Sequence, residues 1–104
     1  MRAPMEATYG KDYFPVLWNE WVDAYAAIYK EKGGDICKED IKTIKCPTLI
    51  IHGDKDAMVA PEHPPHMHGA IPGSRLHRFP DGKHNLHFKY KEEFNKMVED
   101  FLLE

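Results

Sequence analysis

The sequence predicts an α/β fold, and three observations support this. Elements alternate along the 104 residues in the order helix, strand, helix, strand, helix, the pattern of parallel strands joined by a crossover helix. Residues 48–52 form a short, apolar, β-branched run that is typical of a strand buried in a parallel sheet. Residues 75–79 alternate in character and predict the second strand.

The first predicted helix spans residues 13–31. Its apolar side chains recur every three or four positions and form one stripe: Phe14, Leu17, Trp18, Trp21, Val22, Tyr25, Ile28 and Tyr29. Gly33 and Gly34 end it. The stripe is rich in aromatic residues and has two interpretations. Packing in the protein core is favoured, and a wall or lid over a ligand pocket is the alternative.

The other predicted elements are short helices and a longer C-terminal one. A helical turn or two is expected at 38–44 and a helix near 61–70, while Tyr90–Leu102 has the pattern of an amphipathic helix. Turns are predicted at Pro72-Gly73 and at Pro80-Asp81-Gly82.

Composition narrows the classes of function. The chain is 42% hydrophobic and 30% charged with a net charge of −3, which favours neither nucleic acid nor a membrane as partner. No apolar run approaches the roughly 18 residues of a spanning helix, and residues 1–10 lack the apolar core of a secretory signal. Cys37 and Cys46 form no C-x-x-C motif, so a reducing compartment is expected.

A metal site is not expected. His63, His66 and His68 are close in sequence, but neither they nor His84 and His87 have the spacing of a known zinc motif. Solvated histidines around a crossover helix are the preferred interpretation. No cofactor is predicted.

The two predicted strands are too few to bury the apolar run of the first strand. An apolar run such as Leu49–Ile51 is normally covered on both faces and flanked by further strands. The sequence therefore predicts part of a domain, with a preceding part of the same domain as its partner.

Candidate catalytic residues follow the two strands. Asp54 and Asp56 come after the first strand and His84 after the second, at the sheet edge where open α/β folds bind ligands. A carboxylate that accepts the Nδ1–H of histidine fixes its tautomer and stabilises the imidazolium, so that Nε2 serves as general base and acid. Asp56 is preferred because it lies further from the strand end, and Asp54 is expected to face solvent or to cap the turn.

These residues resemble the α/β-hydrolase superfamily. The run from Cys46 to Asp56, followed by Val59, is similar to the loop that carries the acid, and Gly82-Lys83-His84 is similar to the G-x-H of the base. The order of acid before histidine agrees with that family. The runs 72–77, 82–87, 93–96 and 99–102 resemble the C-terminal part of hydrolases of α-amino acid esters, and residues 9–14 and 21–23 the end of their helical cap.

The resemblance implies the C-terminal portion of an α/β-hydrolase fold. Residues 1–45 are then cap helices and a connection, and residues 46–104 carry the acid and histidine loops. The implied activity is a serine esterase with a Ser-His-Asp triad, a small-molecule ester substrate and a mitochondrial or cytoplasmic location. Asp56 and His84 take the acid and base positions.

The nucleophile of that triad is not found. The family places it in a G-x-S-x-G elbow, and the chain has no such motif. Ser74, the only serine, precedes a strand with no elbow glycine after it and is not expected to react. The chain alone is therefore expected to be inactive. The alternative function is a truncated, non-catalytic α/β-hydrolase-derived protein that binds a partner through an unpaired strand edge.

Overall fold

The computed structural model describes residues 1–104 as two compact units. We call Met1–Lys38 the N-terminal unit and Glu39–Glu104 the C-terminal unit. The short 3-10 helix η1 (Asp40–Thr43) lies at the predicted 38–44 turn and contacts the next helix along the chain, α3 (His63–Ala70). The compact C-terminal unit thus begins a few residues before the predicted boundary at residue 46.

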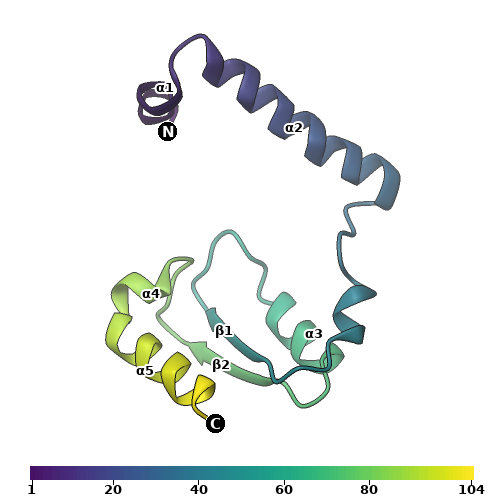
Figure 1. Ribbon diagram of the computed structural model, residues 1–104, viewed down its shortest axis with the longest axis vertical. Coiled ribbons are helices and arrows are strands. Elements are labelled where there is room, and N and C mark those ends of the chain that lie inside the picture. The colour runs from purple at the N-terminus through teal and green to yellow at the C-terminus, as the bar shows by residue number, and fades with distance from the viewer. The chain divides into compact units, whose positions relative to one another are not determined.

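The N-terminal unit consists of helix α1 (Arg2–Tyr9), which the sequence did not predict, and the long helix α2 (Tyr13–Lys32) (Figure 1). The observed α2 agrees within one residue with the predicted span. It ends because Gly33 adopts a left-handed φ of 62° and donates its N–H to the Tyr29 carbonyl. Glycine adopts this conformation without the clash that a Cβ would cause.

The aromatic stripe of α2 is mostly exposed. Its rings form a ladder in which Phe14 contacts Trp18, Trp18 stacks on Trp21 at 5.3 Å, and Trp21 contacts Tyr25 at 4.7 Å. Only Phe14 is buried, whereas Trp21 and Tyr25 are each 52% exposed. Within this unit only Phe14 of the stripe is in the core, Leu17 and Ile28 are half-buried, and the remaining side chains are exposed.

The C-terminal unit is built on two parallel strands, β1 (Leu49–Gly53) and β2 (Arg75–Phe79). They pair in register from Leu49 opposite Arg75 to Gly53 opposite Phe79. Helix α3 makes the crossover between them, as the sequence predicts, with prolines in its first turn. A proline is favourable there because its missing N–H would have no helical partner.

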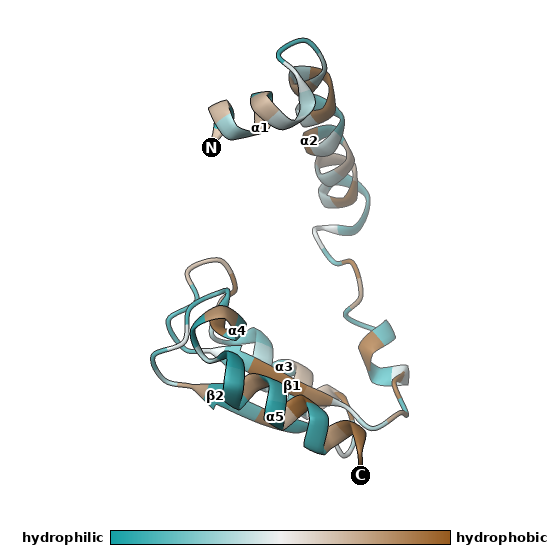
Figure 2. Ribbon diagram, turned by 60° about the vertical axis from the view of Figure 1, so that its left-hand side comes forward, coloured by the Kyte–Doolittle hydropathy of each residue, from teal (hydrophilic) through white to brown (hydrophobic).

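Helices cover both faces of this sheet. Helix α3 lies on one face, and α4 (Leu86–Lys89) with α5 (Lys91–Leu102) lies on the other (Figures 1 and 2). Helix α5 corresponds to the predicted C-terminal helix, whereas α4 was not predicted. The buried apolar side chains of the unit are few: Ile50, Ile71, Phe79 and Leu86.

The sheet stops at two strands. Ile50 is buried, but Leu49 and Ile51 on the same strand are only half-buried. Alternate residues of a parallel strand direct their N–H and C=O groups to opposite sides, so β1 and β2 each present one unpaired edge. None of the helices combines the length and hydropathy that crossing a bilayer requires.

Candidate active site

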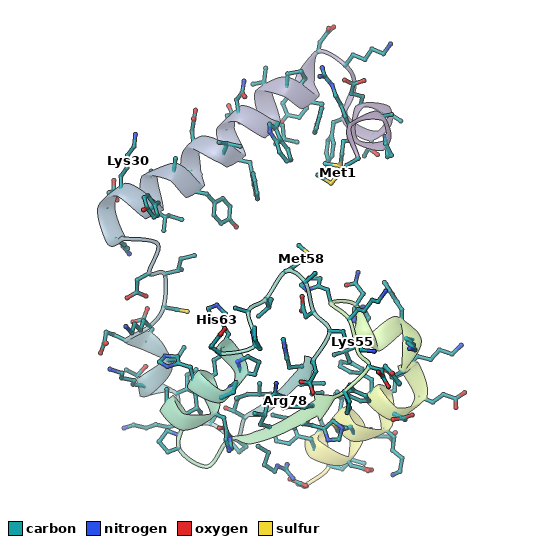
Figure 3. All side chains as sticks on the ribbon, turned by 180° about the vertical axis from the view of Figure 1, so that it is seen from behind. Met1, Lys30, Lys55, Met58, His63 and Arg78 are labelled. Carbon is teal, nitrogen blue, oxygen red and sulfur yellow. The ribbon has the colours of Figure 1, made fainter.

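Asp56 is held by the loop that follows β1. Its N–H donates to the Gly53 carbonyl at 3.0 Å, which turns the chain back toward the strand. Its Oδ1 accepts the N–H groups of Met58 at 2.7 Å and Val59 at 3.0 Å. Met58 lies at the exposed tip of the loop (Figure 3). These bonds fix the carboxylate, whose side chain is only 6% exposed.

His84 reaches this carboxylate from the turn after β2. Its Nδ1 lies 2.9 Å from Oδ2 of Asp56. An ionised carboxylate only accepts hydrogen bonds, so Nδ1 carries the proton and Nε2 is left as the free acceptor of the neutral ring. The His84 side chain is 46% exposed. The structure therefore brings together the two residues that the sequence nominated, in the orientation that general base chemistry requires.

The electrostatics of Asp56 favour its ionised form. Burial disfavours the carboxylate and is the largest single influence on its pKa, but the hydrogen bonds from His84, Met58 and Val59 together outweigh it. The pKa of Asp56 is consequently lowered below its ordinary value of 3.8. A carboxylate that stays charged can orient the imidazole and stabilise its cation.

Asp54 forms an ion pair with Arg78. Its Oδ1 accepts a hydrogen bond from Nε of Arg78 at 2.6 Å, and its side chain is about a third exposed. The residue is exposed, as expected, and its carboxylate is engaged by a strand residue that the sequence did not indicate. Arg78 is the strand residue paired with His52 and lies one position before Phe79, and it engages Asp54 while Asp56 engages His84.

A hollow of about 270 Å³ adjoins the Asp56–His84 pair. Both residues line it, and apolar side chains from the Asp56 loop, α3 and α4 complete its wall, among them Val59, Met67 and Leu86. An apolar hollow beside a few convergent polar groups is typical of a small-molecule site. Buried His52 also lines it.

Ser74 is poorly placed as a nucleophile. It precedes β2, at the opposite end of that strand from the His84 turn, and is only 7% exposed. Its Oγ donates to the His68 carbonyl at 3.1 Å and lies 3.0 Å from Nδ1 of the same residue. Its hydroxyl therefore connects the end of α3 to the start of β2.

The remaining histidines do not gather into a metal site. No group of three histidine, cysteine or carboxylate side chains is arranged to hold a metal ion. His87 on α4 instead packs its ring against Phe88 at 4.3 Å and Phe94 at 5.9 Å.

Most of the chain matches a known protein family. Residues 1–89 match the family described as the alpha/beta hydrolase fold. The chain belongs to this family, and its paired strands with the Asp56 and His84 loops at one end agree with a part of that fold.

Within this family, the chain is similar to several individual hydrolases. The chain is 46% identical over 101 residues to serine hydrolase BPHL of Homo sapiens and 45% identical to the same protein of Mus musculus, in each case over 97% of the chain. This agrees with the narrower resemblance of runs 72–77 and 82–87, which is to valacyclovir hydrolase, or biphenyl hydrolase-like protein. A 2-hydroxy-6-oxo-2,4-heptadienoate hydrolase of Pseudomonas putida is 32% identical over 89 residues. The chain spans 35% of the length of the two mammalian relatives.

Proposed function

We propose that the chain supplies the acid and base of a serine hydrolase that cleaves carboxylic esters, with α-amino acid esters as the favoured class. The observation that carries the proposal is the 2.9 Å contact between His84 Nδ1 and Asp56 Oδ2, which leaves Nε2 free. The two mammalian relatives, both named as serine hydrolases, support the reaction type. The ester class rests on the sequence resemblance alone.

The mechanism needs a serine that Ser74 does not provide. In a longer protein of this fold, a serine on an elbow between strand and helix attacks the ester carbonyl. His84 takes the serine proton at Nε2 and gives it to the leaving alcohol, while Asp56 orients the ring and stabilises its cation. Water activated by the same histidine then releases the acid. No step calls for a metal or cofactor.

The test is turnover by the product of the complete reading frame. Asp56→Asn is expected to lower kcat by about 10⁴-fold, because the amide favours the wrong tautomer of His84. Activity is measured with a chromogenic ester and with α-amino acid esters. Near-normal turnover in Asp56→Asn would show that Asp56 is not the acid.

Asp54→Asn is the matched control. Its carboxylate also follows β1, but it pairs with Arg78 rather than with His84. We expect it to lower kcat by less than about tenfold, because the partner that it loses is Arg78 and the Asp56–His84 contact stays in place. A large loss in Asp54→Asn with a small loss in Asp56→Asn would exchange the roles of the two carboxylates.

A non-catalytic binding protein is the second candidate. It is favoured by the buried, hydrogen-bonded state of Ser74 and by the unpaired edge of β1. The isolated 104-residue chain is expected to hydrolyse no ester. A folded, inactive chain that pairs through β1 would support this candidate, whereas ester turnover by the isolated chain would contradict both proposals.

For location we propose the mitochondrion or the cytoplasm. The proposal is supported by two free, exposed cysteines, Cys37 and Cys46, which suit a reducing compartment. Imaging of the tagged product of the complete reading frame tests it, and a secreted product would contradict it.

A further inference from the structure

The loops that carry Asp56 and His84 touch through their backbones at two glycines. Gly53 is the last residue of β1, and Gly82 lies in the turn after β2. The Lys55 N–H donates to the Gly82 carbonyl at 2.9 Å, and the Asp54 N–H donates to the Phe79 carbonyl at 2.9 Å. Both glycines are buried. The two loops therefore form one hydrogen-bonded layer beneath the site.

Gly53 has no room for a side chain. A Cβ added there would contact the Gly82 carbonyl oxygen, and would lie 2.5 Å from the Gly82 carbonyl carbon and 2.7 Å from the Lys83 oxygen. Gly53 is not among the glycines with positive φ, so its backbone conformation is open to other residues. Glycine is needed here for the close approach of two backbones.

This close approach bears directly on His84. Lys83, whose oxygen would clash, is bonded to His84 along the chain. Moving the Gly82 carbon from 2.5 Å to an ordinary carbon–carbon contact needs a displacement of about 1 Å. A shift of that size directed along the 2.9 Å contact between His84 and Asp56 would lengthen it past the roughly 3.5 Å at which a hydrogen bond is lost.

We propose that Gly53 is a positioning residue, which sets the distance between His84 and Asp56 through its backbone contact with Gly82 and Lys83. The inference rests on the proposed catalytic role of the pair. Ion pairs also bridge these loops, but Lys55 and Asp81, joined at 2.6 Å, are 60% and 65% exposed. Exposed pairs of this kind hold geometry weakly. The backbone contacts therefore set the loop spacing, with the hydrogen bonds holding the loops together and the Gly53 contact fixing how closely they approach.

The experiment uses the 104-residue chain and measures the hydrogen bond between His84 and Asp56 rather than turnover. One readout is the Nδ1–H proton of His84 in the chain labelled with ¹⁵N-histidine. The other is the pKa of Asp56, followed by ¹³C NMR of its carboxyl group. The hydrogen bond from His84 lowers that pKa, so its loss raises the pKa. A failed catalytic proposal would leave both signals intact, so the two proposals fail separately.

Gly53→Ala is expected to abolish the Nδ1–H signal and to raise the pKa of Asp56 in the folded chain. The matched control is Gly69→Ala on α3, where an added Cβ meets nothing within 4 Å, and neither signal should change. Asp81→Asn should also leave both signals in place. A folded Gly53→Ala chain with both signals unchanged would overturn the proposal.

Gly82→Ala is the second, milder variant. Its Cβ would lie 2.8 Å from Cβ of Phe79 and 3.1 Å from Cα of Gly53. We expect the same two changes at smaller amplitude in the folded population, which NMR distinguishes from unfolded chain. If both glycine variants are wholly unfolded while Gly69→Ala folds, the proposal is overturned, because the contact then maintains the fold and not the position of His84.

Discussion

The two units of the chain differ in how many of their large apolar side chains they bury. The N-terminal unit has five aromatic residues between Phe14 and Tyr29, yet buries only Phe14. The C-terminal unit buries four apolar side chains between a small sheet and its helices, and places Asp56 against His84. The difference teaches that local sequence sets where a helix begins and ends, whereas a core and a site need segments distant in sequence to meet.

The largest expected effect comes from the core of the C-terminal unit. Phe79 is 4% exposed and its ring contacts those of His77 and Tyr90. Phe79→Ala is expected to reduce the free energy of unfolding by about 3–5 kcal/mol, comparable with the whole stability of a small unit. Amide hydrogen exchange in β1 measures this loss. The control is Phe88→Ala, at a residue 74% exposed, and equal losses in both variants would contradict the assigned core.

A smaller effect is expected at the end of α2. Gly33→Ala places a Cβ in the left-handed conformation, at a cost of about 1–2 kcal/mol. Far-UV circular dichroism should show fraying of the helix, while hydrogen exchange in β1 stays unchanged. Gly33→Asn should retain more helix because asparagine tolerates this conformation. Equal helix content in the wild-type and Gly33→Ala chains would refute the assigned cap.

The aromatic ladder should contribute less again. Trp21→Ala removes ring contacts with Trp18 and Tyr25, and each exposed contact is expected to stabilise α2 by about 0.5–1 kcal/mol. Fluorescence of the remaining Trp18 reports the change in the N-terminal unit. A marked loss of β1 protection in this variant would show that the stripe is not confined to its own unit.

The smallest effect is expected at acid pH. The pKa of Asp56 is lowered in the folded chain, so its ionised form stabilises the fold above the ordinary value of 3.8, and this contribution is lost as pH falls through the lowered pKa. Burial offsets part of the gain, which keeps the contribution small. Thermal melting between about pH 6 and about pH 2 tests this, and His84→Ala should lose less stability on acidification than the wild-type chain. An equal loss of stability on acidification in the wild-type and His84→Ala chains would contradict the prediction.

Much of the C-terminal unit could be predicted from local patterns. The continuous apolar run of β1 and the alternation of β2 are both typical of strands, and the prolines before Ala70 indicate the start of a helix. The meeting of Asp56 and His84 followed from topology, because parallel strands end at the same sheet edge. The pairing of Asp54 with Arg78 could not be predicted, since it depends on the register between the strands.

The glycine contact shows what sequence reasoning missed. A glycine at a strand end is a weak signal of close backbone approach, and nothing local identifies Gly82 as its partner. The exposure of Trp21 also could not be predicted. Periodicity shows which side chains share a face of a helix, but not what covers that face.

The sequence by itself determined both strands, the crossover helix α3, the helices α2 and α5, their order, and the two residues nominated for chemistry, but not the short helices α1 and α4. Hydrophobic periodicity, prolines and glycines act over a few residues, so their effects can be recognised in the sequence. Only the tertiary structure decided that α2 exposes its rings, that Asp54 binds Arg78, and that Gly53 packs on the backbone beside His84. Those features depend on distances between segments remote in sequence, and such distances are fixed only when the elements pack.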